Sequence, residues 1–199
     1  WECNKTILSG DIQQDGQFNN NSQTIISTQN LGYNALIFDG FCITGAYDES
    51  GFGGAWNNIA ANGPSGLEIR NTIIQGNYAK SGGAAFYNGS GNGPADVIFK
   101  NVKISNNEAD RGGAIFQYAA TGGESSVYII NSILSGNNAS FSGGAIYNES
   151  ESPENQMAIA AVYAVNSVFS GNSTDTAGVN SYGGVLFTSS DIEDISSLT

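Results

Sequence analysis

A short N-terminal segment spaces its acidic residues as a calcium-binding loop does. In Asp11-Ile-Gln-Gln-Asp15-Gly16, oxygen-bearing side chains stand at positions 1, 3 and 5 and a glycine at position 6. A calcium loop would also need a bidentate glutamate at position 12, where this chain has Ser22. The same residues suit a turn in which an aspartate accepts hydrogen bonds from the nearby backbone. We favour the turn, with calcium bound by Asp11 and Asp15 as the alternative, and we expect no other cofactor.

A second set of charged residues has the types that polysaccharide-cleaving enzymes use. A lyase needs a base that removes a proton and cations that bind the carboxylates of the substrate, and Arg70 and Lys100 stand at equivalent positions of two repeats. A pair of carboxylates about 5–9 Å apart would permit glycoside hydrolysis instead. Candidates such as Glu108 and Asp110 do not recur in register, and Glu68 offers Arg70 a partner. Enzymatic activity is therefore the less favoured hypothesis.

The composition excludes several classes of function. The 199 residues include 6 Lys or Arg, 18 Asp or Glu and no His, which gives a net charge of −12. Without histidine there is no His-based triad, general base or metal ligand. The negative charge argues against a nucleic-acid partner, and no run of 18 apolar residues predicts a membrane span. The small share of charged residues and the many Asn, Ser, Thr and Gly residues favour an extracellular protein.

The two cysteines, Cys3 and Cys42, are too few for a disulfide framework or a structural zinc site. They could form one disulfide that ties the N-terminal edge to the next layer of the fold. They could equally be two buried thiols. Only the distance between them decides, so both alternatives stay open.

An internal repeat dominates the sequence. Each copy begins and ends with an asparagine, and a Gly-Gly pair with a short apolar run follows it. The copies are Asn71-Thr-Ile-Ile-Gln-Gly-Asn77, Asn101-Val-Lys-Ile-Ser-Asn-Asn107, Asn131-Ser-Ile-Leu-Ser-Gly-Asn137 and Asn166-Ser-Val-Phe-Ser-Gly-Asn172, and their first residues lie 30, 30 and 35 positions apart. A degenerate earlier copy begins at Asp39. Such a period is typical of a solenoid, in which stacked repeats bury an apolar face that one repeat cannot bury alone.

The repeat predicts an all-β fold, a right-handed parallel β-helix of about six coils with three short strands per coil. The strands are short, rich in β-branched and aromatic residues, and bounded by Gly and Asn, and the handedness follows the general crossover rule. We expect a single domain over residues 1–199. It would comprise an atypical first layer (1–34), five repeats (35–187) and an acidic tail or the start of a further coil (188–199).

The alternation of side chains along each strand predicts which columns face inward. Leu67 and Ile69 with their equivalents, and Ile74 with its equivalents, should fill the interior. Tyr128 and Tyr163 should point outward as a pair. After the Gly-Gly turn, Ala85, Ile115, Ile146 and Leu186 are expected inside, and an aromatic column is expected outside. This column could contact a glycan or a partner unless the following loops cover it, and a one-residue slip at the turn would invert the facing. It consists of Phe86, Phe116, Tyr147 and Phe187.

The asparagines that begin and end each copy have a structural explanation. Asparagine tolerates the left-handed backbone of a turn, and its amide can bond to the asparagine of the next coil. We therefore predict two structural ladders: Asn71, Asn101, Asn131 and Asn166, and Asn77, Asn107, Asn137 and Asn172.

Two short motifs resemble those of a known family. Phe169-Ser-Gly-Asn172 and Gly143-Gly-Ala-Ile146 resemble the Phe-x-x-Asn and Gly-Gly-Ala-Ile motifs of the chlamydial polymorphic outer-membrane proteins. The longer stretch from Ser135 to Asn148 is similar to the repeat of bacterial right-handed parallel β-helix surface proteins, and the resemblance covers about residues 35–190. It implies a secreted or cell-surface bacterial protein that adheres or serves as a stalk. Relatives with the same coil include polysaccharide lyases and glycoside hydrolases.

These observations favour an extracellular or cell-surface structural or adhesive module without enzymatic activity, part of a larger secreted protein. The alternative is a carbohydrate-active β-helix enzyme, a polysaccharide lyase or a glycoside hydrolase. The expected partners are a glycan or a protein surface. Because a solenoid exposes strand edges at its ends, these ends could also pair with other copies or with neighbouring domains of the same parent chain.

Overall fold

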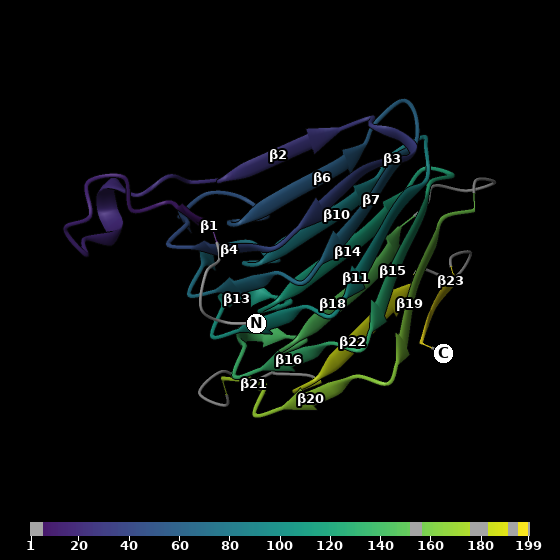
Figure 1. Ribbon diagram of the computed structural model, residues 1–199. Helices are drawn as coiled ribbons and strands as arrows, with labels where there is room; N and C mark the ends of the chain where they lie inside the picture. The colour runs from purple at the N-terminus through teal and green to yellow at the C-terminus, as the bar shows by residue number, and fades with distance from the viewer. Residues whose placement is uncertain (1–5, 152–156, 176–182, 191–194, 199) are drawn as a thin grey trace.

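Parallel strands stack into a solenoid in the computed structural model, which describes residues 6–151, 157–175, 183–190 and 195–198 (Figure 1). Every pair of neighbouring strands is parallel, with partners about one repeat apart in the sequence. This confirms the predicted all-β solenoid. The chain forms a first rung of β1–β3 and then about five turns, slightly fewer than the six coils expected.

The strands form three long sheets and a short fourth one. Sheet A contains β1 (Thr6–Ser9), β4 (Phe41–Thr44), β8 (Ile73–Gln75), β12 (Lys103–Ser105), β16 (Ile133–Ser135) and β20 (Val168–Ser170). Sheet B contains β2 (Ile26–Gln29), β6 (Trp56–Ala60), β10 (Phe86–Ser90), β14 (Ile115–Ala120), β18 (Ile146–Glu151) and β22 (Leu186–Ser190). Sheet C contains β3 (Gly32–Asp39), β7 (Ser65–Arg70), β11 (Ala95–Lys100), β15 (Glu124–Ile130), β19 (Ile159–Val165) and β23 (Ile195–Leu198).

Sheet D forms the corner between sheets A and B, and its strands follow the second asparagine of each repeat. It contains β5 (Tyr47–Asp48), β9 (Tyr78–Ala79), β13 (Glu108–Arg111), β17 (Asn138–Ser142) and β21 (Ser173–Thr174). Most of these strands are too short to show a side-chain alternation in the sequence. A short 3-10 helix, η1 (Phe18–Asn20), lies in the loop between β1 and β2, which projects from the solenoid (Figure 1).

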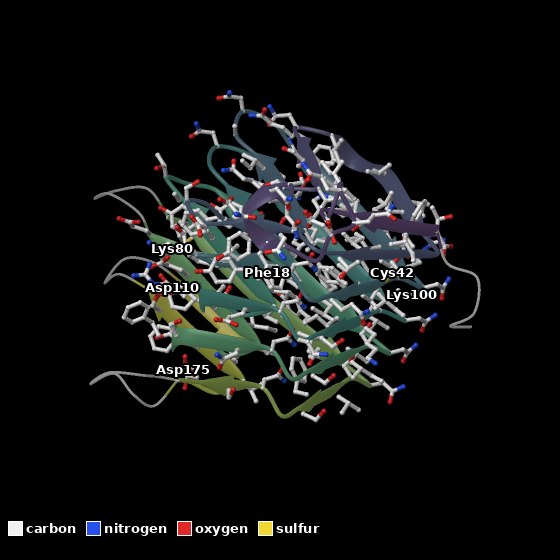
Figure 2. All side chains as sticks on the ribbon, turned by 90° about the vertical axis from the view of Figure 1, so that its left-hand side faces the viewer. Phe18, Cys42, Lys80, Lys100, Asp110 and Asp175 are labelled. Carbon is white, nitrogen blue, oxygen red and sulfur yellow. The ribbon has the colours of Figure 1, made fainter. Side chains whose placement is uncertain are left out.

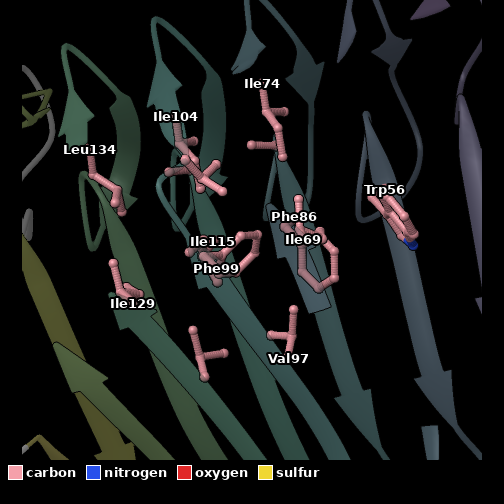
Figure 3. Close-up of a cluster of buried hydrophobic side chains, with 14 of the residues drawn as sticks. Trp56, Ile69, Ile74, Phe86, Val97, Phe99, Ile104, Ile115, Ile129 and Leu134 are labelled. Atoms are coloured by element: carbon pink, nitrogen blue, oxygen red, sulfur yellow. The ribbon is translucent and has the colours of Figure 1, made fainter. Parts of the chain in front are cut away.

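The inward columns of sheets A and C are as predicted. Leu67, Ile69 and Ile74 are at most 3% exposed, and their equivalents in the following rungs complete one continuous core (Figure 3). Because β-strand register is the same from rung to rung, each buried side chain lies on the equivalent side chain of the next turn.

The predicted facing of Phe86 is wrong. Phe86 is fully buried, pairs with Trp56 and Ile115 in sheet B, and packs edge-on against Phe99 at 5.1 Å between ring centroids. The cause is a one-residue offset at the glycine pair, because Gly83 and not Gly82 is the structural equivalent of Gly112.

Both of these glycines have a left-handed backbone, with φ of 62° at Gly83 and 58° at Gly112. A Cβ atom on Gly112 would lie 2.1 Å from the carbonyl oxygen of Ile115, so this corner requires glycine. The outward aromatic column therefore consists of Tyr87, Phe116, Tyr147 and Phe187.

The asparagine ladder inside the solenoid is confirmed. Asn77, Asn107 and Asn137 are at most 2% exposed. Nδ2 of Asn77 donates to Oδ1 of Asn107 at 3.0 Å, and the same bond joins Asn107 to Asn137 and Asn137 to Asn172 at 2.9 Å. Each Oδ1 also accepts the backbone N–H of the preceding asparagine in the ladder, so the ladder satisfies backbone and side chain together.

The second ladder lies on the outside, at the corner between sheets C and A. Asn71, Asn101, Asn131 and Asn166 all have left-handed backbone, with φ of 45°, 56°, 50° and 48°. Nδ2 of Asn166 donates to Oδ1 of Asn131 at 2.8 Å, and Asn101 donates to Asn71 at 3.4 Å. These asparagines are therefore needed first for the turn conformation and only second for the amide bond.

A third column of buried amides runs through sheet B and was not predicted. It aligns Asn58, Asn88, Gln117 and Asn148, all fully buried. Asn58 donates to Asn88 at 2.9 Å, but the longer Gln117 donates instead to the carbonyl oxygens of Ser125 and Ala161. Oε1 of Gln117 and Oδ1 of Asn148 are left as buried acceptors without a hydrogen bond.

The inner ladder predicts an unequal response to two asparagine substitutions. Asn107→Ala removes the acceptor of the Asn77 amide and the donor to Asn137, so we expect the free energy of unfolding to fall by about 3–5 kcal/mol. Asn101→Gly keeps the left-handed turn, and we expect a loss below about 1 kcal/mol. Urea unfolding of both variants measures the difference. Equal losses would show that the inner ladder has no special role.

The interruption at Gln117 predicts a stabilising substitution. Gln117→Asn would let the amide column continue from Asn88 to Asn148 and would supply a donor for the unbonded Oδ1 of Asn148. Satisfying a buried polar group is worth about 1–3 kcal/mol, against about 0.8 kcal/mol for the lost methylene. We expect the melting temperature to rise by about 2–4 °C. Asn88→Gln, which interrupts the column a second time, is the control and should lower it.

Candidate functional site

The proposed calcium segment forms hydrogen-bonded turns. The carboxylate of Asp11 accepts the backbone N–H groups of Asp15 and Gly16 at 3.3 and 3.2 Å, and that of Asp15 accepts the N–H of Gln17 at 2.8 Å. The bond from Gln17, followed by one from the side chain of Asn20, lowers the pKa of Asp15. Within the described ranges, no three His, Cys, Asp or Glu residues are grouped as metal ligands. The geometry favours the turn, and calcium at this segment stays an untested prediction.

The choice between a disulfide and two thiols is not tested either. Cys3 lies outside the described residues, and Cys42 lies half-buried on β4.

Arg70 and Lys100 occupy equivalent positions on neighbouring strands of sheet C, close to Glu68. Arg70 makes an ion pair with Glu68, which lowers the pKa of Glu68 chiefly through the hydrogen bond between them. A depression of ≈ 230 Å³ lies on the outer face of sheet C, and Glu68 and Asp96 contribute to its wall. Arg70 and Lys100 are not among its lining residues. The two cations and a carboxylate therefore do not meet in this groove.

The aromatic column outside sheet B is largely covered. Phe116 contacts Tyr147 at 4.9 Å and Tyr87 at 5.6 Å between ring centroids, and Phe52 contacts Phe116 at 5.2 Å. Phe116 is 2% and Tyr147 6% exposed, and the guanidinium of Arg111 lies 5.6 Å from the ring of Tyr147. These rings form a second small core outside the solenoid wall. Such a core stabilises the corner but offers little ring surface to a ligand.

Three tyrosines of this outer core, Tyr87, Tyr118 and Tyr147, have pKa values that are raised chiefly by burial. Burial, reinforced by the charge of Glu149, raises the pKa of Tyr87 to about 12. Burial also raises the pKa of Tyr118, whose hydroxyl donates to Glu151 at 2.8 Å. The phenols of Tyr87 and Tyr118 therefore stay neutral in the folded protein at a pH where an exposed tyrosine ionises.

The raised pKa of Tyr87 predicts a loss of stability at high pH. Since the folded-state pKa exceeds the unfolded value of 10, the contribution is complete below pH 10 and is lost as the pH rises to about 12. We expect the wild type to lose about 2 kcal/mol more than Tyr87→Phe over this interval. Denaturant unfolding at several pH values measures both proteins. Parallel pH profiles would contradict the assignment.

Sheet C carries the predicted outward tyrosine pair. The rings of Tyr128 and Tyr163 stack with centroids 4.8 Å apart and planes 11° apart. They continue a column that starts with Ile37, Glu68 and Ile98, and Ile37 is 57% exposed. The pair and the depression next to Ile98 therefore lie along one face of one sheet.

An apolar patch, which the sequence did not indicate, lies at the Asn131 corner in the later rungs. Ile133, Val165 and Val168 are 43%, 59% and 54% exposed, and Ile130 lies beside them. Equivalent positions in earlier rungs hold Arg70, Lys100 and Lys103. This change from charged to apolar residues between repeats is the feature of the sequence that could have revealed the patch. No helix among the described residues is long and apolar enough to cross a membrane.

A pocket of ≈ 410 Å³ at the corner of sheets A and D is the second site that the sequence did not reveal. Phe18, Tyr47 and Tyr78 contribute aromatic rings, and Asn106 and Glu108 contribute polar groups. Phe18 comes from the η1 loop, and Figure 2 looks onto this side of the molecule. Tyr47 and Tyr78 stand at the same position of two consecutive repeats, which could have indicated part of this pocket. Phe18 lies outside the repeat, so the period does not reveal its place.

Comparison of the chain with protein-family models, curated proteins and solved structures found no match.

Proposed function

We propose that this chain is an extracellular structural and adhesive module without enzymatic activity, a segment of a larger secreted bacterial protein. The support is that its regular columns serve the coil: apolar columns fill the interior, amides join the turns, and glycines form the corners. The low content of charged residues and the resemblance to β-helix surface proteins support the extracellular assignment.

The outer face of sheet C is the observation that carries the adhesive function. Tyr128 and Tyr163 present stacked rings with their hydroxyls, and the depression near Ile98 adds the carboxylates of Glu68 and Asp96. Aromatic groups that combine apolar surface with polar atoms suit sugar rings, and carboxylates accept hydrogen bonds from sugar hydroxyls. A glycan lying along the solenoid is therefore the proposed ligand.

The enzyme alternative has less support. Arg70 is held by Glu68, and neither Arg70 nor Lys100 lines the depression that would hold the polysaccharide. Incubation with a panel of polyuronates distinguishes the hypotheses, because a lyase produces unsaturated sugars that absorb ultraviolet light.

A glycan array tests the adhesive function. We expect the wild type to bind a subset of glycans. The double variant Tyr128→Ala, Tyr163→Ala should bind them at least about fivefold more weakly, since each stacking ring contributes about 0.5–1.5 kcal/mol. Phe141→Ala, which removes a 56% exposed ring from sheet D, is the matched control and should bind as the wild type does. Binding that survives the double substitution would place the adhesive surface elsewhere.

A further inference from the structure

The corner pocket is built from a stack of three aromatic rings. Phe18 stacks on Tyr47 with centroids 5.6 Å apart, and Tyr47 stacks on Tyr78 at 4.8 Å. The solenoid register places Glu108 directly after Tyr78 in the same column of sheet D. Tyr47 thus covers one face of the Tyr78 ring. The other face points toward the next rung, where the exposed carboxylate of Glu108 lies.

The loop that carries Phe18 is fixed to the solenoid by several hydrogen bonds. Nδ2 of Asn21 donates to the carbonyl oxygen of Gly45 at 2.7 Å, and the backbone N–H of Tyr47 donates to the carbonyl oxygen of Ser22 at 2.9 Å. Phe18 itself is 63% exposed although it takes part in the stack. The loop therefore holds a large apolar ring at the mouth of the pocket.

The turn at Asn106, which lines the pocket, differs in residue type from the equivalent turns of the other rungs. Four described rungs have a glycine with left-handed backbone at this position: Gly45, Gly76, Gly136 and Gly171. The equivalent residue of the middle rung is Asn106, with φ of 55°, and its exposed side chain lines the pocket. Glycine forms this turn in the other rungs, so the turn does not need an amide side chain. The amide of Asn106 instead adds a polar group to the pocket.

The surroundings of the pocket are negative. Glu108 lines it, and burial, followed by the charges of Asp110, Glu108 and Glu49, raises the pKa of Tyr78. Burial, followed by interactions with Glu49, raises the pKa of Tyr47 as well. Among the described residues that line the pocket, none is Lys or Arg. Aromatic rings with a carboxylate and without a competing cation are the chemistry that binds organic ammonium groups.

We propose that this pocket binds a quaternary ammonium group, such as the trimethylammonium headgroup of choline. The group would lie over the face of Tyr78 that Tyr47 leaves open, with its positive charge toward Glu108 and with Phe18 at the mouth of the pocket. The net charge of −12 attracts cationic ligands to the whole molecule, and the volume of ≈ 410 Å³ accommodates such a headgroup. The site is independent of the glycan-binding face, which lies on sheet C.

Titration of the full chain with choline, followed by NMR, tests the proposal. We expect choline to shift the ring signals of Phe18, Tyr47 and Tyr78. The neutral carbon analogue, in which a tert-butyl group replaces the trimethylammonium group, has the same shape and should bind at least about fivefold more weakly, because it lacks the cation–π attraction.

Two variants separate charge from shape. Glu108→Gln keeps the size of an exposed side chain and should weaken choline binding by about threefold or more without changing the affinity for the neutral analogue. Glu124→Gln removes an exposed carboxylate from sheet C and should leave choline binding unchanged. Equal affinities for choline and its analogue, shifts confined to other rings, no shifts at all, or an unchanged affinity in Glu108→Gln would each overturn the proposal. None of these results bears on the glycan array, whose variants lie on another sheet.

Discussion

The inner asparagine ladder is the interaction on which the register of this solenoid depends. A buried asparagine such as Asn107 has two donors and an acceptor that water cannot reach. Its bonds to Asn77 and Asn137 form only when these residues lie one rung away in the same register, and its amide also donates to the carbonyl oxygens of Ile74 and Ser105. A slip of one residue in any turn would leave several polar atoms unbonded inside the molecule. Apolar columns tolerate small shifts because dispersion is non-directional, but the amides do not. The ladder thus specifies the register, and the apolar core supplies most of the stabilisation.

Register fixed on the inside also arranges the outside. Because every rung repeats the same alternation, outward residues of one type stack on each other, as Tyr128 does on Tyr163 and Tyr47 on Tyr78. The surface of a solenoid is therefore a set of columns in which a single substitution changes one rung. This explains how a column that holds the charged residues Asp39, Arg70 and Lys100 continues as the apolar Ile130 and Val165 without any change of fold.

The sequence revealed the features that recur at a constant spacing and concealed those that do not. The solenoid, the inner ladder and the core columns of sheets A and C follow from the thirty-residue period. Sheet B was misaligned because Gly82 and Gly83 both look like the corner glycine, and only the backbone conformation shows that Gly83 occupies it. The same offset hid the buried amide column, since Asn88 and Gln117 align only after the shift. The corner pocket was hidden because Phe18 reaches it from outside the repeat.

Departures from a repeat have different meanings inside and outside the wall. Gln117 departs from an asparagine column in the interior, where it leaves buried oxygens unbonded, and no solvent or ligand can reach them. Its effect is confined to stability. Asn106 departs from a glycine column at the surface, where glycine already provides the left-handed turn in the other rungs, and its amide lines a pocket. In a solenoid, the interior determines most residue types. An exposed position whose residue differs from the one that the other rungs use is therefore the strongest local indication of binding. By this reasoning the corner of sheets A and D, rather than the covered aromatic column of sheet B, is where a small ligand is to be sought.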